Sequence, residues 1–191
     1  KAAWLRAIGT PGEYVFERKL KKVREIDHPD FDGELYLQAS GPGFFQKLLK
    51  LFPKKMTGKK PAVAVPFYHP DGMVGFDLST REPLLHFQEI TIALDLVRRG
   101  FITAVADAYP FHFPADDPTL GQEEFKCDYS RYGTFASWKI AGEKLMREYP
   151  GWTGIGKLVF DTKLLLDTLS EDARVDSARI GIAGHSLGGK M

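Results

Sequence analysis

Short apolar runs alternate with longer segments of helical periodicity from Pro61 to the end of the chain. The apolar runs cover 62–67, 101–106 and 179–183, and polar or turn residues bound each of them. Apolar positions at helical spacing predict helices over 84–97, 136–148 and 154–169. Continuous apolar runs of this length are typical of buried strands, and their alternation with helices is typical of parallel sheets. The pattern therefore predicts an α/β fold with a mostly parallel sheet and helices on both of its faces.

The first part of the chain follows a different pattern. Residues 2–8 have the apolar spacing of a short leading helix, and Pro11 with Gly12 ends it. Two β-like stretches, 14–16 and 34–37, are separated by turn-forming residues. We expect these stretches to be flanking strands, paired antiparallel.

The segment 41–60 stands out because it holds six lysines and no acid, interleaved with phenylalanine and leucine. One interpretation is a basic amphipathic helix that contacts a lipid surface or covers an active site as a lid. The interpretation we favour is an insertion whose apolar face packs on the body of the protein while its lysines stay in solvent. Either way, we expect the segment to be an addition to the fold.

Composition and charge narrow the function classes. Lys and Arg number 26 against 25 Asp and Glu, a net charge of +1, so no global field favours nucleic acid. The single cysteine, Cys127, cannot form an intramolecular disulfide, and no Cys/His cluster has zinc spacing. We expect no metal and no cofactor. No apolar stretch reaches the ~18 residues of a membrane span, so we expect a soluble chain. The single cysteine leaves the compartment open, with the cytoplasm favoured and a secreted mature form as the alternative.

The last apolar run leads into Gly184-His185-Ser186-Leu187-Gly188, a G-x-S-x-G motif at a strand end. A serine on a sharp turn between strand and helix has strained backbone geometry, and small residues on either side allow the close approach that the turn requires. Such a turn lifts the Ser186 hydroxyl out of the sheet. The backbone N–H of Leu187 is then a candidate donor to an oxyanion.

Ser186 and its surroundings resemble the nucleophile elbow of the α/β-hydrolase superfamily. The stretch 175–190 is similar to the branch of dienelactone-hydrolase-like and acetylxylan-esterase-like proteins, and the resemblance extends from Pro61 to Met191. It implies a serine nucleophile and an acyl-enzyme formed on carboxylic esters. Because dienelactone hydrolase itself has cysteine at this position, Ser186 favours the esterase side of the branch. The implied substrate is a small ester, acetyl or another short acyl group, with carbohydrate esters among the candidates.

The resemblance also implies a second oxyanion donor in the loop after the first parallel strand. Relatives have His-Gly there, and this sequence does not. Since Pro70 has no N–H to donate, the candidates are the backbone amides of Tyr68 and His69. For His69 the alternative is a loop residue that bonds the backbone and holds the turn.

The loop after the second parallel strand lies at the same edge of the sheet, where ligands bind in open α/β folds. Tyr109 and His112 are candidates for lining a substrate pocket there. The alternative that we favour is that these side chains pack the long loop.

The remaining members of a catalytic triad are missing from the chain. In this superfamily the order is serine, acid, histidine. The five histidines are His28, His69, His86, His112 and His185, and neither a histidine nor an acid follows Ser186. We therefore expect one domain that is incomplete at its C-terminus, with 1–60 as flanking elements and 61–191 as the core, and the acid and base beyond Met191. The 191-residue chain by itself should be inactive as an esterase and of low stability.

Two other interpretations remain open. Gly184 with Gly189-Lys190 also matches the G-x-x-x-x-G-K of a phosphate-binding loop, but Met191 stands where Ser or Thr should hold magnesium, and two strand–helix units precede the motif. A non-catalytic binding protein of the same fold is the second alternative, because the residues that would decide it are absent. Against it, a strained elbow costs stability that catalysis would justify.

Overall fold

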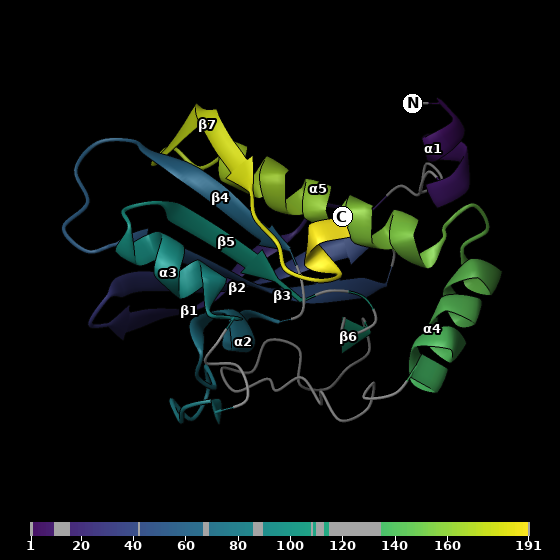
Figure 1. Ribbon diagram of the computed structural model, residues 1–191, viewed down its shortest axis with the longest axis horizontal. Coiled ribbons are helices and arrows are strands. Elements are labelled where there is room, and N and C mark those ends of the chain that lie inside the picture. The colour runs from purple at the N-terminus through teal and green to yellow at the C-terminus, as the bar shows by residue number, and fades with distance from the viewer. Residues whose placement is uncertain are drawn as a thin grey trace.

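The computed structural model describes a single sheet with helices on both of its faces (Figure 1). The described residues are 2–9, 16–41, 43–66, 69–85, 90–107, 109, 113–114 and 135–190. Among them the sheet has seven strands in the order β1-β2-β3-β5-β4-β7, with β6 paired to β3. The sheet is mixed, since one half is antiparallel and the other parallel.

The antiparallel half comes from the first part of the chain. It contains β1 (Leu20–His28), β2 (Phe31–Gly41), β3 (Phe44–Pro53) and the short β6 (Phe113–Pro114). A tight turn at residues 29–30 joins β1 to β2. β3 pairs antiparallel with β5, and this pairing joins the two halves into one sheet.

The parallel half comprises β4 (Lys60–Pro66), β5 (Ile102–Ala106) and β7 (Val175–Ile182). β4 lies between the other two and pairs parallel with both. The carboxyl ends of all three strands therefore meet at one edge of the sheet, called the carboxyl edge below. Ligands of open α/β sheets bind at this edge.

Helices lie on both faces of the sheet and beyond one end of it (Figure 1). They are α1 (Ala2–Ile8), α2 (Pro70–Val74), α3 (Ile92–Arg98), α4 (Phe135–Glu148), α5 (Gly154–Ser170) and the 3-10 turn η3 (Gly188–Lys190). Within the ranges just given, no helix is long and apolar enough to cross a membrane.

Alternation along β4 explains how both faces are covered. Val63 and Val65 belong to the core on the α3 side, whereas Ala62 and Ala64 belong to the core that includes Leu165 of α5. Successive side chains of a strand point to opposite faces. A strand buried on both faces needs consecutive apolar residues, and β4 supplies them in its buried part, residues 62–66.

The structure confirms the α/β fold and most elements of the 61–191 part. The three apolar runs fall in β4, β5 and β7, and the helices expected over 136–148 and 154–169 are α4 and α5. The third run was expected to be a buried strand, but β7 is largely exposed, because it is the last strand in the order of the described sheet. The helix expected over 84–97 is shorter, because α3 begins at Ile92; residues 86–89 lie outside the described part. The leading helix is observed as α1.

The first 60 residues differ from expectation. β1 at Leu20–His28 was not predicted, and of the stretch expected at 14–16 only Phe16 is described, outside any strand. The reason is composition: β1 is rich in charged residues and has a half-exposed pattern, so its apolar signal is weak.

The interpretation of 41–60 as an added amphipathic helix or lid is wrong. Its first half is β3, which lies between β2 and β5. The expectation that its lysines stay in solvent is also wrong for Lys47 and Lys50, which are 3% and 5% exposed. Lys47 pairs with Asp71 at 2.6 Å and Lys50 with Asp172 at 2.8 Å. Both carboxylates are remote in sequence, which is why the lysines suggested a solvated surface.

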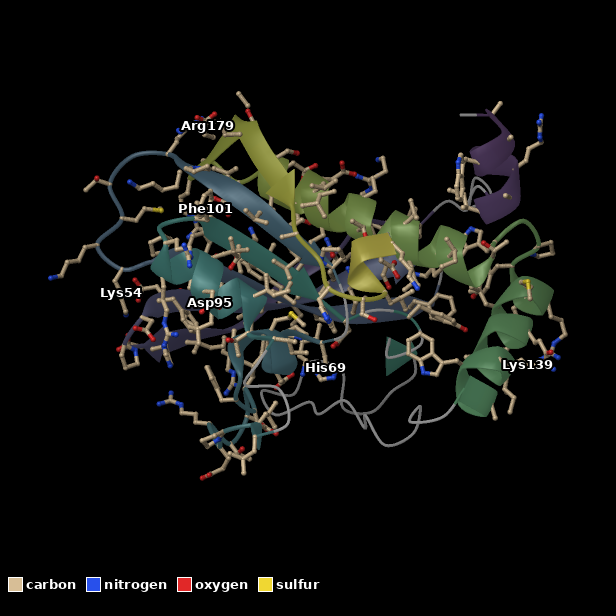
Figure 2. All side chains as sticks on the ribbon, in the orientation of Figure 1. Lys54, His69, Asp95, Phe101, Lys139 and Arg179 are labelled. Carbon is tan, nitrogen blue, oxygen red and sulfur yellow. The ribbon has the colours of Figure 1, made fainter. Side chains whose placement is uncertain are left out.

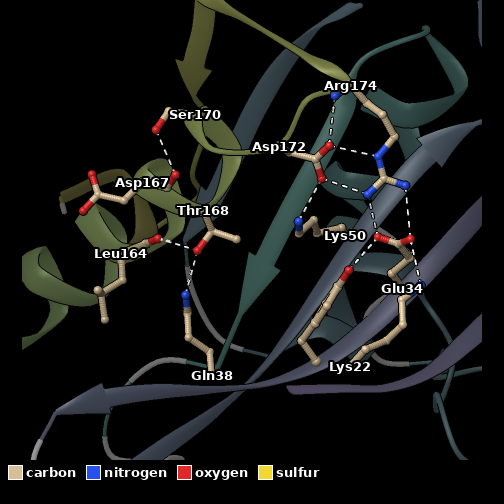
Figure 3. A network of polar contacts seen from close by, with 11 residues as sticks. Lys22, Glu34, Gln38, Lys50, Leu164, Asp167, Thr168, Ser170, Asp172 and Arg174 are labelled. Carbon is tan, nitrogen blue, oxygen red and sulfur yellow. Dashed lines mark hydrogen bonds and ion pairs between the residues drawn. The ribbon is translucent and has the colours of Figure 1, made fainter. Parts of the chain in front are cut away.

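A charged network ties the two halves of the sheet together at the edge opposite the carboxyl edge (Figure 3). The guanidinium of Arg174, just before β7, donates to both oxygens of Glu34 on β2 at 3.1 and 2.7 Å, and also donates to Asp172. Burial acts against ionisation of Glu34, but Arg174, Tyr36 and Lys22 together lower its pKa to about 2. Because the Arg174–Glu34 contact is bidentate and its members share partners, this network should contribute more to stability than an isolated ion pair on the surface.

Candidate active site

The G-x-S-x-G motif begins where β7 leaves the sheet. The amide of Ala183 donates to the carbonyl of Ala64 on β4 at 3.0 Å, one residue beyond the end of β7. The chain then turns away from the strand. This hydrogen bond places the motif at the carboxyl edge, beside the end of β4.

Ser186 lies at the tip of this turn in left-handed backbone geometry, with φ +54°. Non-glycine residues rarely adopt this region, and it costs of order 1–2 kcal/mol. The turn is closed by Gly188 N–H donating to His185 O at 2.9 Å and Gly189 N–H donating to Ser186 O at 3.2 Å. Ser186 is exposed. The structure therefore has the strained, outward-facing serine that the motif predicts.

The glycines of the motif are required by close backbone approach. A Cβ added to Gly184 would overlap the carbonyl of Gly188 and lie 2.9 Å from the amide nitrogen of Gly189. Gly188 is itself buried. Any side chain at Gly184 would push the two sides of the turn apart, and Ser186 would move with them.

Leu187 follows the serine and leads into the single turn η3, closed by Lys190 N–H donating to Leu187 O at 2.9 Å. Its side chain packs against a core cluster that includes Tyr109, Leu145 and Trp152. This packing anchors the turn. Donation by its backbone N–H to an oxyanion stays a prediction.

The loop after β4 is described only from His69, so Tyr68 lies outside the described residues. His69 precedes α2 and is 3% exposed (Figure 2). Burial lowers the pKa of the His69 imidazole to about 4, with Lys47 acting in the same direction and Asp71 against it. The ring is therefore neutral near pH 7. The role of its backbone amide as the second oxyanion donor stays a prediction.

The loop after β5 brings Tyr109 to the same edge but uses it for packing. The side chain is buried, and its hydroxyl donates to the carbonyl of Ala141 on α4 at 2.7 Å. Its ring meets Phe44 edge-on. These contacts are those of the packing role favoured above. His112 lies outside the described residues.

Sequence reasoning missed a buried cluster of ionisable side chains at this edge, formed by Lys47, Asp71 and Asp107. The Lys47 ammonium donates to Asp71, and the Lys47 amide donates to Asp107 Oδ2 at 3.1 Å. Burial raises the pKa of Asp107 to about 8, with Asp71 adding to the rise and Lys47 opposing it. The position of Asp107 directly after an apolar run was a usable signal. Nothing local marked Lys47.

In the described parts of the chain, no carboxylate or imidazole hydrogen-bonds to the Ser186 hydroxyl. His28 stacks on Phe31 and Phe76 at the opposite edge, and His185 lies exposed within the turn itself. His86 and His112 are outside the described residues. Nor do the side chains covered by the structure include three His, Cys, Asp or Glu grouped to hold a metal ion.

Comparisons with known proteins identify the fold. No protein-family model matches the sequence, and none of the curated proteins matches it. Among solved structures, a proposed acetyl xylan esterase from Bacteroides fragilis is 17% identical with TM-score 0.69, over 93% of this chain and 44% of that one. A glucuronoyl esterase from Solibacter usitatus is 15% identical with TM-score 0.60, over 98% and 51%. A glucuronoyl esterase from Teredinibacter turnerae is 19% identical with TM-score 0.58, over 96% and 43%.

These structures share one fold with this chain, the α/β-hydrolase fold. At such low identity the likeness concerns the fold. The chain spans about half the length of the structures that it matches.

Proposed function

We propose that this chain carries the nucleophile of a serine carboxylic ester hydrolase. The observation that carries the proposal is the geometry of Ser186, a non-glycine residue at φ +54° on an exposed turn that directly follows a parallel strand. Strain of this kind concentrates at functional sites. The fold, shared with esterases, supports the same reaction class.

In the proposed reaction, Ser186 Oγ attacks the ester carbonyl carbon while a histidine base takes the hydroxyl proton. The bond to the alcohol breaks, the histidine returns the proton to the leaving alcohol, and an acyl-enzyme remains. Water then attacks the acyl group, releases the carboxylic acid and restores the serine. The amide of Leu187 and a second amide after β4, from Tyr68 or His69, would stabilise the oxyanion of both tetrahedral intermediates.

We place the acid and the histidine of the triad in a part of the complete protein that follows Met191. Two observations support this: the described residues bring no acid or base to Ser186, and the matched esterases are about twice as long. The domain would then continue beyond the serine turn. The 191-residue chain alone would contain the nucleophile Ser186 but lack the histidine and acid that activate it.

The preferred substrate class is a short-acyl ester, and the names of the similar structures, acetyl xylan esterase and glucuronoyl esterase, favour esters on carbohydrate. The same fold without catalysis is the second candidate function. The phosphate-binding loop is a weaker one, because β4 and β5 precede the motif strand β7 in the chain. Nucleotide stabilisation of the protein against heat would favour that interpretation.

The test uses the complete protein and a matched pair of substitutions. Ser186→Ala should abolish hydrolysis of p-nitrophenyl acetate and labelling by a fluorophosphonate, whereas Ser177→Ala, at an exposed serine on β7, should change neither. Both variants should keep the circular dichroism spectrum of the parent. Hydrolysis that survives Ser186→Ala would remove the nucleophile assignment, and a protein inert from the start would favour the non-catalytic alternative.

A further inference from the structure

Lys47 is an unusual residue for the middle of a sheet. It lies on β3 with its side chain 4% exposed, and its ammonium contacts the 6% exposed carboxylate of Asp71 at 2.6 Å. Removing two charges from water is costly, and a buried pair is weak as a source of stability. A geometric role is therefore a better explanation for this pair than stabilisation.

Lys47 contacts two of the three chain segments that leave the sheet at the carboxyl edge. Asp71 lies in α2, which follows β4. The backbone of Lys47 pairs with Asp107, which follows β5, because Asp107 N–H donates to Lys47 O at 2.9 Å. One lysine on β3 thus contacts the exits of both β4 and β5.

Asp71 also fixes the far end of α2. Its second oxygen accepts from the amide of Leu78 at 2.7 Å, and its backbone carbonyl accepts from Gly75 at 2.8 Å. The left-handed Gly75 ends the helix. The position of α2 along the sheet edge is therefore held by the Asp71 carboxylate, which Lys47 contacts, together with the core packing of Met73 and Val74.

The position of α2 affects the distance between Ser186 and any hydrogen-bond donor in the segment that contains His69. The bond between Ala183 N–H and Ala64 O is the last described one between β7 and β4. Beyond it the serine turn and the segment containing His69 leave neighbouring strands at the same edge. The distance between the serine and any donor on that segment depends on how α2 is held.

We propose that Lys47 and Asp71 are positioning residues for ester hydrolysis, which hold His69 and α2 so that the second oxyanion donor faces Ser186. This rests on the proposed function. Preorganised donors act in the transition state more than in substrate binding. Loss of the pair should therefore lower kcat and leave KM nearly unchanged.

The chain supplies a matched control on the same strand. Lys50 is similarly buried, at 6% for its side chain, and contacts the equally buried Asp172 at 2.8 Å. Its side chain lies on the opposite face, because it is three residues away along the strand. Its partner precedes β7, at the edge away from Ser186. Lys50→Met thus also removes a buried ammonium from β3 without touching α2, although Asp172 keeps its bonds to Arg174.

The experiment measures p-nitrophenyl acetate hydrolysis and thermal unfolding for the complete protein and both methionine variants. Lys47→Met should lower kcat about 10- to 100-fold with KM changed less than about threefold. Lys50→Met should also lower the Tm, by a smaller amount because Arg174 still donates to Asp172, and should change kcat less than about twofold. Assays are run well below each Tm.

Asp71→Asn keeps an oxygen for the Leu78 amide but removes the charge that Lys47 meets. It should reproduce the kcat loss, and it tests the proposal if Lys47→Met does not fold. Unchanged kcat in both variants, or an equal loss in Lys50→Met, would overturn the positioning role while leaving Ser186-dependent hydrolysis intact. Absence of any Ser186-dependent hydrolysis in the parent would instead overturn both proposals together.

Discussion

The ammonium of Lys157 and the carboxylate of Asp161 form a fully buried ion pair one helical turn apart on α5. The ammonium also donates to Ser40 O at the end of β2, at 2.8 Å, and lies over the rings of Phe44, Trp152 and Phe160. The Asp161 carboxylate accepts from the Tyr109 backbone. The pair therefore connects α5 to β2 and to the loop after β5, close to the cluster on which Leu187 packs.

Removing one member of this pair should be costly. Lys157→Met leaves Asp161 buried without its counter-charge, and such losses are worth about 3–5 kcal/mol. The matched control is Lys163→Met, which breaks an exposed pair with Asp167 at the same spacing on the same helix, worth less than about 1 kcal/mol. Urea unfolding of both variants measures the difference. Equal losses in the free energy of unfolding would show that the buried pair contributes no more to stability than the exposed one.

Gly184→Ala should disrupt the serine turn. The new methyl group would overlap the carbonyl of Gly188, and overpacking of this kind costs about 1–3 kcal/mol. Gly181→Ala, three residues earlier, meets no atom within 4 Å and should be nearly neutral. Chemical denaturation checks the stability of each variant, and fluorophosphonate labelling of the complete protein checks the turn. Normal labelling of Gly184→Ala would show that the turn accommodates a side chain.

The strained backbone at Ser186 should lower the stability of the folded protein. Glycine adopts φ +54° without penalty, so Ser186→Gly should be more stable than Ser186→Ala by about 1 kcal/mol. Neither variant retains the nucleophile. Denaturation midpoints compare them directly. An alanine variant as stable as the glycine variant would contradict the strained geometry.

Asp107 predicts a pH dependence of stability. Burial raises its pKa in the folded protein to about 8 from an ordinary 3.8. Between these values the folded state binds the proton and the unfolded state does not, so this group's contribution falls as pH rises from about 4 to about 8. The slope is about 1.4 kcal/mol per pH unit for one proton.

Asp107→Asn should remove that slope, because the amide does not titrate. The measurement is the free energy of unfolding of parent and variant at several pH values from 5 to 8, and their difference isolates Asp107 from His69 and the other titrating groups. Parallel curves would mean that Asp107 is ionised in the folded protein.

The serine motif and the parallel elements could be predicted because their signals are local. The alternating environments of β4 and the helical spacing of α5 follow from residues within each element. The turn at Ser186 follows from glycines two residues away. The roles of Leu187, Tyr68 and His69, by contrast, came from resemblance, and they stay predictions.

The sequence by itself determined the α/β class, the order of the parallel elements and the position of the serine, since periodicity and turn chemistry act over a few residues. Only the tertiary structure decided that β3 lies inside the sheet and that its lysines are buried. Their partners Asp71 and Asp172 are 24 and 122 residues away. A lysine side chain is expected to be exposed to solvent, because burying its charge is costly unless a carboxylate pairs with it. Folding alone brings these distant carboxylates to the two lysines.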